Sequence, residues 1–238
     1  MQGGTPAYAA PRFISAHERK TGSISLHPNG YTLLTASMDS HASIWDLRKW
    51  PTTPVVDIRG DKKHPVDTTD EGSADWQHIA KPGPFQPLAS MDHGHSVTSG
   101  YFSPSGQRFV TTCNDDTIRI YDTKSCLAGS GFFDAKGAGL AKGKKGGAMT
   151  TIRHNNHVGR WLSNFRTVWD PRGDDVVLVG AMKTRQVEVF DAVTGSRLHA
   201  FADPDRMTAV PTLNAIHPVL PFLGATTASG RVHLWQAD

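Results

Sequence analysis

One pattern occurs four times along this chain of 238 residues, and it limits the folds that the chain can adopt. Each copy contains a short alternating strand, an X-Pro turn, a second strand, a polar turn and a third strand that closes on an aromatic residue. The copies run through 27–46, 103–122, 170–191 and 217–235, and the aromatic residue follows the proline by 17, 17, 19 and 17 positions. Such regular spacing predicts a repeat protein in which each unit buries its apolar face against the next.

Local signals within the copies predict β-structure. Residues 28–30 (Pro-Asn-Gly) and 104–106 (Pro-Ser-Gly) are typical of type I turns, with Pro at the second position and Gly at the fourth. Residues 117–121 alternate between apolar and polar side chains, as in a strand that is buried on one face. No stretch shows helical periodicity, so we expect an all-β chain.

The repeat resembles the WD-repeat family in its closing Trp45-Asp46, in Gly94-His95 before the second copy and in the turn residue Asp115. The third and fourth copies lack the Gly-His pair and the turn Asp. The resemblance implies a WD-repeat β-propeller with four recognisable blades of seven, so that further N-terminal blades complete the ring. It also implies that His, turn Asp and a strand Ser or Thr form a structural hydrogen-bond network, and not a hydrolase triad. We expect no catalytic residues, no enzyme activity and no cofactor.

We expect one partial propeller over residues 1–238. The expected bounds are blades at about 14–50, 93–124, 160–196 and 207–238, with inter-blade insertions at 56–91 and 124–149. Only 38% of the residues are hydrophobic, and the N-terminus lacks the basic and apolar regions of a secretory signal. We therefore expect a protein that stays inside the cell and does not contact a membrane.

Positive charge is concentrated in residues 135–169, which contain seven Lys or Arg and no Asp or Glu, although the whole chain carries only +3. A separation of charge of this kind favours a surface that meets a polyanion. The alternative is a solvated basic loop. The charges alone do not decide between the two.

Within this basic stretch, residues 152–162 follow no WD-repeat rule. The segment is a polar, basic loop with a Gly for a sharp turn, an Arg and a Trp at its expected tip, and two Asn amides that can hydrogen-bond bases or phosphates. This composition predicts a nucleic-acid hairpin. The candidate DNA-binding residues are Arg153, His154, Asn155, Asn156, Gly159, Arg160, Trp161, Lys144 and Lys145.

The His-Asn-Asn-x-x-Gly-Arg-Trp run also resembles the WD-repeat DNA damage-binding proteins known from fungi as changed-mutation-rate proteins. A more distant resemblance is to the smaller subunit of the UV-damage DNA-binding complex, whose inter-blade hairpin pushes out damaged bases. By this resemblance the wedge falls at Gly159, Arg160 and Trp161, and the indole stacks in the gap left by an extruded base. The alternative is that Trp161 packs on the blade surface.

Two further motifs require interpretation. His154 and His157 have an H-x-x-H spacing, but the acid-free stretch around them contains no Cys or carboxylate to complete a coordination shell, so we expect no metal site.

Asp46 and Arg48 form a W-D-x-R ending, which only the closing pair of the first copy has. In propellers that serve as substrate receptors of cullin-RING ubiquitin ligases, this ending binds the adaptor. The alternative is that Arg48 is an ordinary exposed residue.

Together these features predict a nuclear, DNA-binding WD-repeat protein that prefers damaged, UV-type DNA and acts in the DNA damage response or DNA repair. The expected partners are DNA, a cullin-RING ligase adaptor and chromatin proteins. The competing hypothesis is a protein-interaction scaffold that does not bind DNA directly, in which residues 135–169 are a passive linker.

Overall fold

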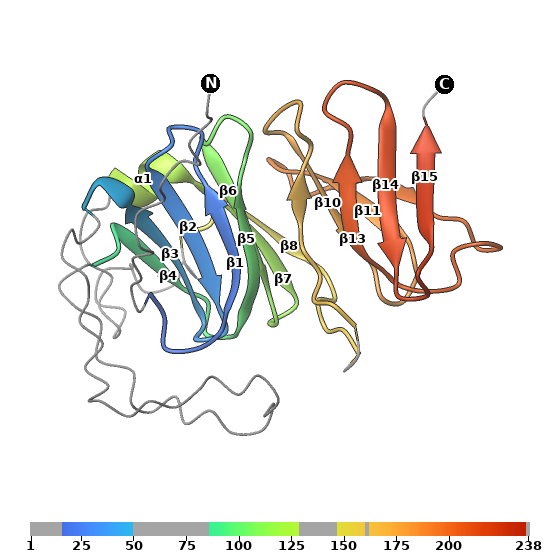
Figure 1. The fold of residues 1–238 in the computed structure, drawn as a ribbon, viewed down its shortest axis with the longest axis horizontal. Helices are drawn as coiled ribbons and strands as arrows, with labels where there is room; N and C mark the ends of the chain where they lie inside the picture. Colours follow the sequence, from blue (N-terminus) through green and yellow to red (C-terminus); the bar gives the residue numbers. More distant parts are fainter. Residues whose placement is uncertain (1–15, 50–85, 129–146, 160–161, 237–238) are drawn as a thin grey trace, which may run out of the picture.

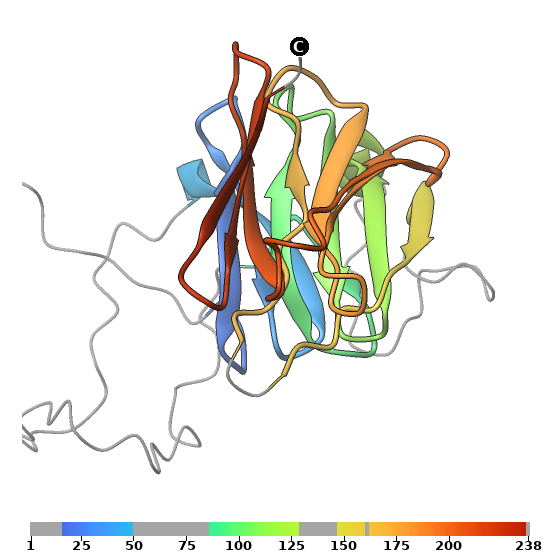
Figure 2. The same cartoon turned by 90° about the vertical axis from the view of Figure 1, so that its right-hand side faces the viewer.

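The computed structural model describes residues 16–49, 86–128, 147–159 and 162–236. Four antiparallel sheets stand side by side in chain order (Figure 1), and Figure 2 looks onto the last of them. The first sheet contains β1 (Thr21–Leu26), β2 (Thr32–Ser37), β3 (His41–Asp46) and β4 (Ala89–Asp92), with the short 3-10 helix η1 (Leu47–Lys49) after β3. The second contains β5 (Val97–Phe102), β6 (Arg108–Cys113), β7 (Thr117–Asp122) and β8 (Thr150–Arg153), with helix α1 (Thr123–Ala128) after β7.

The remaining two sheets repeat the same plan. The third contains β9 (Val168–Trp169), β10 (Val176–Gly180), β11 (Val187–Asp191) and β12 (Arg197–Phe201). The fourth contains β13 (Pro211–Ile216), β14 (Phe222–Thr227) and β15 (Val232–Gln236). The all-β prediction is confirmed, and the closing aromatics Trp45, Tyr121, Phe190 and Trp235 all lie on the third strand of their sheets.

The sheet topology corrects the expected position of the two insertions. The segment 56–91 ends within β4, whose Met91 pairs with Ala42 of β3, and the segment 124–149 lies between β7 and β8. Each insertion therefore separates the third and fourth strands of one sheet and does not separate two blades. Most of both segments lies outside the described residues, and α1 begins the second one.

The strands end at two opposite edges of the molecule, which we call the proline-turn face and the loop face. The proline-turn face carries the X-Pro turns and the ends of the third strands, at the upper edge of Figure 1. The loop face carries the turns between the second and third strands, at 38–40, 114–116, 181–186 and 227–231. It also carries the connection 154–167, because Arg153 at the end of β8 pairs with Thr117 at the start of β7.

Neighbouring sheets pack through apolar faces and a few polar contacts. The largest core cluster joins the second and third sheets through buried side chains that include Ile118, Phe165 and Val177. The Thr112 and Thr167 hydroxyls lie 2.8 Å apart across this junction. Gly180 lets the third and fourth sheets approach closely, because a Cβ there would overlap the Pro211 carbonyl oxygen. No helix in the described part of the chain is long and apolar enough to cross a membrane.

Candidate nucleic-acid interface

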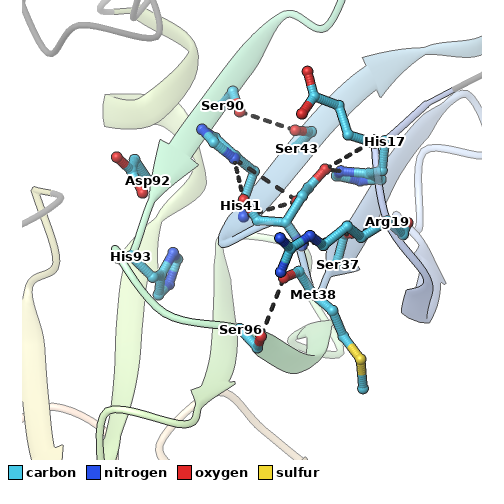
Figure 3. A network of polar contacts seen from close by, with 12 residues as sticks. His17, Arg19, Ser37, Met38, His41, Ser43, Ser90, Asp92, His93 and Ser96 are labelled. Atoms are coloured by element: carbon cyan, nitrogen blue, oxygen red, sulfur yellow. Dashed lines mark hydrogen bonds and ion pairs between the residues drawn. The ribbon is translucent and has the colours of Figure 1, made fainter. Parts of the chain in front are cut away.

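A histidine network closes the loop face of the first sheet, and Figure 3 shows its surroundings. His17 Nδ1 lies 2.9 Å from Asp39 Oδ2, and His17 Nε2 lies 2.7 Å from Thr35 Oγ1. The Trp45 indole donates to the same Thr35 oxygen at 2.8 Å. Burial alone would raise the pKa of Asp39, but hydrogen bonds with His17 and His41 outweigh it and lower this pKa far below its usual value. The turn carboxylate thus stays ionised and locks the closing tryptophan through His17 and Thr35.

The second sheet repeats this network with a histidine that the sequence interpretation missed. His93 is buried, with Nε2 2.9 Å from Thr111 Oγ1 and 3.2 Å from the Tyr121 hydroxyl. His95 of the Gly94-His95 pair is exposed. The signal that could have found His93 is its distance of 28 residues from Tyr121, the same distance that separates His17 from Trp45.

The third sheet places His154 at the equivalent position, directly after the fourth strand of the preceding sheet. The His154 side chain is buried, and its ring contacts the rings of Phe165 and Phe190 edge-on. Gly180 stands ten residues before Phe190, where the other two sheets have a threonine, so a different partner is needed. Asn156 Oδ1 lies 2.7 Å from His154 Nδ1, while His154 Nε2, the nitrogen that faces a threonine in the other two sheets, lies 3.8 Å from Glu188 Oε2. Burial lowers the pKa of His154, although Asn156 and Glu188 act in the opposite direction.

Asn156 anchors the start of the connection to the loop face. Its side chain is buried, and its amide donates to the Cys113 and Thr117 carbonyls at 2.8 and 2.9 Å. Its backbone N–H donates to Asp116 Oδ1 at 3.0 Å. The structure therefore assigns His154 and Asn156 a structural role in place of the predicted DNA contact, because neither side chain reaches the surface.

Beyond this anchor the chain leaves the sheet and returns at Phe165, which is fully buried. Val158 and Leu162 pack against the core cluster from outside, and the Leu162 N–H donates to the Gly159 carbonyl at 2.9 Å. The described ends of the tip are thus held close together between two buried anchors. Arg153, Asn155 and Gly159 are exposed here. The predicted contacts of these residues with DNA require this exposure.

Four of the predicted DNA-binding residues lie outside the described residues. They are Lys144, Lys145, Arg160 and Trp161. The H-x-x-H pair is split between two environments, since His154 is buried whereas the His157 side chain is 66% exposed and 3.7 Å from Asp116. The described residues include no group of three or more His, Cys, Asp or Glu that could hold a metal ion.

The predicted adaptor motif lies on the opposite, proline-turn face. The Arg48 guanidinium donates to both oxygens of Asp46, from Nε and Nη2, at 2.9 Å each. It also covers the Tyr31 ring at 3.9 Å from the ring centre, and its side chain is 64% exposed. The predicted adaptor motif and the predicted DNA-binding segment therefore lie at different ends of the strands.

A second W-D-x-R run, at 169–172, was missed because it does not close a repeat copy. Arg172 donates to Asp170 from Nε and Nη2 at 2.8 and 2.6 Å, the same two-point geometry as in the first run. The pairing of Asp with an Arg two residues later is thus a local consequence of the sequence. It does not by itself identify an interface.

Comparison with known proteins adds independent information. The family model described as WD domain, G-beta repeat matches residues 11–46 and 85–122. The chain is 32% identical to WD repeat-containing protein 76 of Rhinolophus ferrumequinum, with 98% of this chain and 30% of the relative covered. It is 31% identical to DNA damage-binding protein CMR1 of Cryptococcus neoformans var. neoformans serotype D, with 92% of this chain and 40% of the relative covered.

A chain of the crystal structure of the mitotic checkpoint complex has the same fold, with a TM-score of 0.55, 14% identity, and 92% of this chain and 50% of that chain covered. The chain spans well under half the length of the two sequence relatives. The repeat match, the four sheets and the shared fold agree with the predicted β-propeller architecture. The chain is a WD-repeat protein, similar over most of its length to WD repeat-containing protein 76 and DNA damage-binding protein CMR1.

Proposed function

We propose that this protein binds DNA through its loop face and prefers damaged duplexes. The observation that carries the proposal is the segment 157–164, which leaves the loop face between the buried anchors Asn156 and Phe165. The described residues at both ends of the segment are held by buried side chains, so these residues have less entropy to lose on binding than a free linker has. The name of the CMR1 relatives, DNA damage-binding protein, supports the same function.

The residues of this segment suit contact with a distorted base step. An indole such as that of Trp161 can stack where a base has left the duplex, which contributes about 1 to 3 kcal/mol per base. A damaged step opens at a lower cost than an intact one, so a stacking residue favours lesions. Arg160 would hold a phosphate or a groove edge, and Arg153 and Asn155 are exposed near the start of the same connection. Binding of this kind places the protein in the nucleus, in the DNA damage response.

The test is fluorescence polarisation with one labelled duplex, intact or carrying a UV lesion, at fixed salt. We expect Trp161→Ala to reduce the affinity for the damaged duplex by about 5- to 150-fold, the equivalent of about 1 to 3 kcal/mol, and to leave the intact duplex nearly unchanged. Trp161→Phe, which keeps a ring for stacking, should retain most of the preference. Equal binding of both duplexes by the wild-type protein would contradict the damage preference, and unchanged discrimination by a folded Trp161→Ala would exclude the wedge.

A second candidate function, binding of a cullin-RING ligase adaptor, has one supporting observation. Arg48 is exposed on the proline-turn face, away from the segment proposed to bind DNA, so both partners could bind at once. Under the competing scaffold hypothesis this face would bind proteins while the loop face would not bind DNA. The polarisation experiment separates these hypotheses, because a pure scaffold would bind neither duplex.

A further inference from the structure

We infer that the loop face of the third and fourth sheets is a binding track for the phosphate backbone of DNA. The inference rests on the proposed function and extends it from the basic segment 135–169 to three cations outside that segment, Lys183, Arg185 and Arg231. Five residues form this track, and we call them the rim cations: Arg153, Arg166, Lys183, Arg185 and Arg231.

Topology brings the rim cations to one edge although they are spread over 79 positions of the sequence. Arg153 ends β8 and Arg166 lies two residues before β9, on either side of the anchored segment. Lys183 and Arg185 lie in the turn between β10 and β11, and Arg231 ends the turn between β14 and β15. All five side chains are exposed, so the cations follow the loop face from the second sheet to the fourth.

The turns that carry these cations have defined shapes. The β10–β11 turn is closed by the Ala181 N–H, which donates to the Gln186 carbonyl at 2.8 Å, and Arg185 adopts a positive φ of 50° within it. Arg231 donates from Nη1 to the Arg206 carbonyl at 3.1 Å, which holds its stem against the neighbouring connection. The charges are thus presented from fixed backbone positions.

The rim cations differ in their partners from the arginines of the proline-turn face. On the proline-turn face, Arg48, Arg108 and Arg172 each contact a carboxylate, with N···O distances of 2.9, 3.3 and 2.6 Å to Asp46, Asp175 and Asp170. None of the rim cations forms an ion pair with a carboxylate of the described residues. A guanidinium that is already bonded to a carboxylate has little capacity left for a phosphate, whereas an unpaired one can bond it at two points.

Some carboxylates on the same face already accept hydrogen bonds from backbone N–H groups of the protein. Asp116 accepts the Asn156 N–H, and Asp203 accepts the Arg206 N–H at 3.1 Å. Asp205, Asp92 and Glu18 are exposed on the connections of this face and reduce its net field. The excess of unpaired cations is therefore greatest along the third sheet, beside the anchored segment.

The test compares two triple variants with the same loss of charge. Lys183→Gln, Arg185→Gln and Arg231→Gln remove three rim cations outside the basic segment, and Lys49→Gln, Lys124→Gln and Arg172→Gln remove three charges from the proline-turn face. Affinity for intact and lesion-bearing duplexes is measured over a salt series, with folding checked by circular dichroism. Each phosphate contact contributes about 0.9 to the slope of log affinity against log salt, so we expect the rim variant to lose about 2.7 from the slope on both duplexes.

The outcomes separate this inference from the proposed function. The damaged-to-intact affinity ratio should stay at the wild-type value in the rim variant, because phosphate contacts are blind to the lesion. An unchanged slope in the rim variant, or an equal loss in the control variant, overturns the track even if the damage preference persists. A reduced slope without any damage preference in the wild type supports the track and removes only the lesion specificity of the proposed function.

Discussion

The two faces of this protein lie at opposite ends of the same strands and differ in their connections and in the partners of their charged residues. On the proline-turn face, short Pro-containing turns join the strands, and arginines are neutralised by aspartates two residues away, as Arg48 and Arg172 are. On the loop face, a longer connection runs over 154–167, and the rim cations lack carboxylate partners among the described residues, although Arg206 pairs with Asp203 at 3.9 Å. The first face therefore offers shape and local hydrogen bonds, whereas the second also offers net positive charge.

The loop face also has a network of histidine side chains beneath it. Histidines with buried side chains hold the turns in place, with His17 and His93 bonded to threonine. The third sheet has Gly180 in place of the threonine, and its histidine is held by Asn156. Asn156 also anchors the segment proposed to bind DNA. The change in the structural network and the proposed DNA-binding segment thus meet at one residue.

The largest expected effect on the loop face comes from removing its anchor, Asn156. Asn156→Ala removes the two amide hydrogen bonds to the Cys113 and Thr117 carbonyls and the contact with His154, and we expect the free energy of unfolding to fall by about 2 to 4 kcal/mol. Asn155→Ala is the matched control, because its neighbouring amide is exposed and should change stability by less than about 0.5 kcal/mol. Urea unfolding of both variants provides the comparison. Equal stability of the two would show that the anchor contributes nothing.

A second test uses the buried histidine of the second sheet. Burial lowers the pKa of His93 from 6.5 to about 4, so the folded state keeps the ring neutral while the unfolded chain takes up a proton below pH 6.5. The free energy of unfolding should therefore decrease as the pH falls from 6.5 to 4, by at most about 3 kcal/mol from this group. Urea midpoints at pH 7, 5.5 and 4 measure the effect.

The control for this pH dependence is His93→Gln, which can keep a hydrogen bond to Thr111 but cannot titrate. Its stability at pH 7 should be lower, and its loss between pH 6.5 and 4 should be smaller than that of the wild type. His154 contributes with the same sign, since its pKa is also lowered, so some dependence should remain. Identical pH profiles for the two proteins would mean that His93 does not remain neutral in the folded state.

The smallest expected effect concerns the two W-D-x-R runs of the proline-turn face. If Arg48 contacts a ligase adaptor, Arg48→Ala should weaken adaptor recovery from nuclear extract about tenfold, or about 1.4 kcal/mol. Arg172→Ala removes an ion pair of the same geometry and should leave recovery unchanged. Both exposed pairs should contribute little to stability, because solvent screens them. Similar recovery of wild type and both variants would mean that Arg48 is an ordinary surface residue.

Local sequence signals were sufficient for the repeat and its register. Pro-Asn-Gly and Pro-Ser-Gly turns, period-two strands and closing aromatics depend on neighbours within a few residues, so they could be interpreted without coordinates. The same approach failed for the insertions. Strand β4 pairs with β3 across a long intervening segment, and spacing alone does not show which strand a distant segment joins.

The candidate site shows the same division between local and distant information. The sequence by itself determined an all-β WD-repeat chain with a basic, asparagine-containing segment after the second repeat, because composition and periodicity are properties of contiguous residues. Only the tertiary structure decided that His93 and not His95 is buried, and that Asn156 is an anchor while Asn155 is exposed. The physical reason is that the partners of Asn156, the Cys113 and Thr117 carbonyls, come from another strand pair, and folding alone brings them within hydrogen-bond distance.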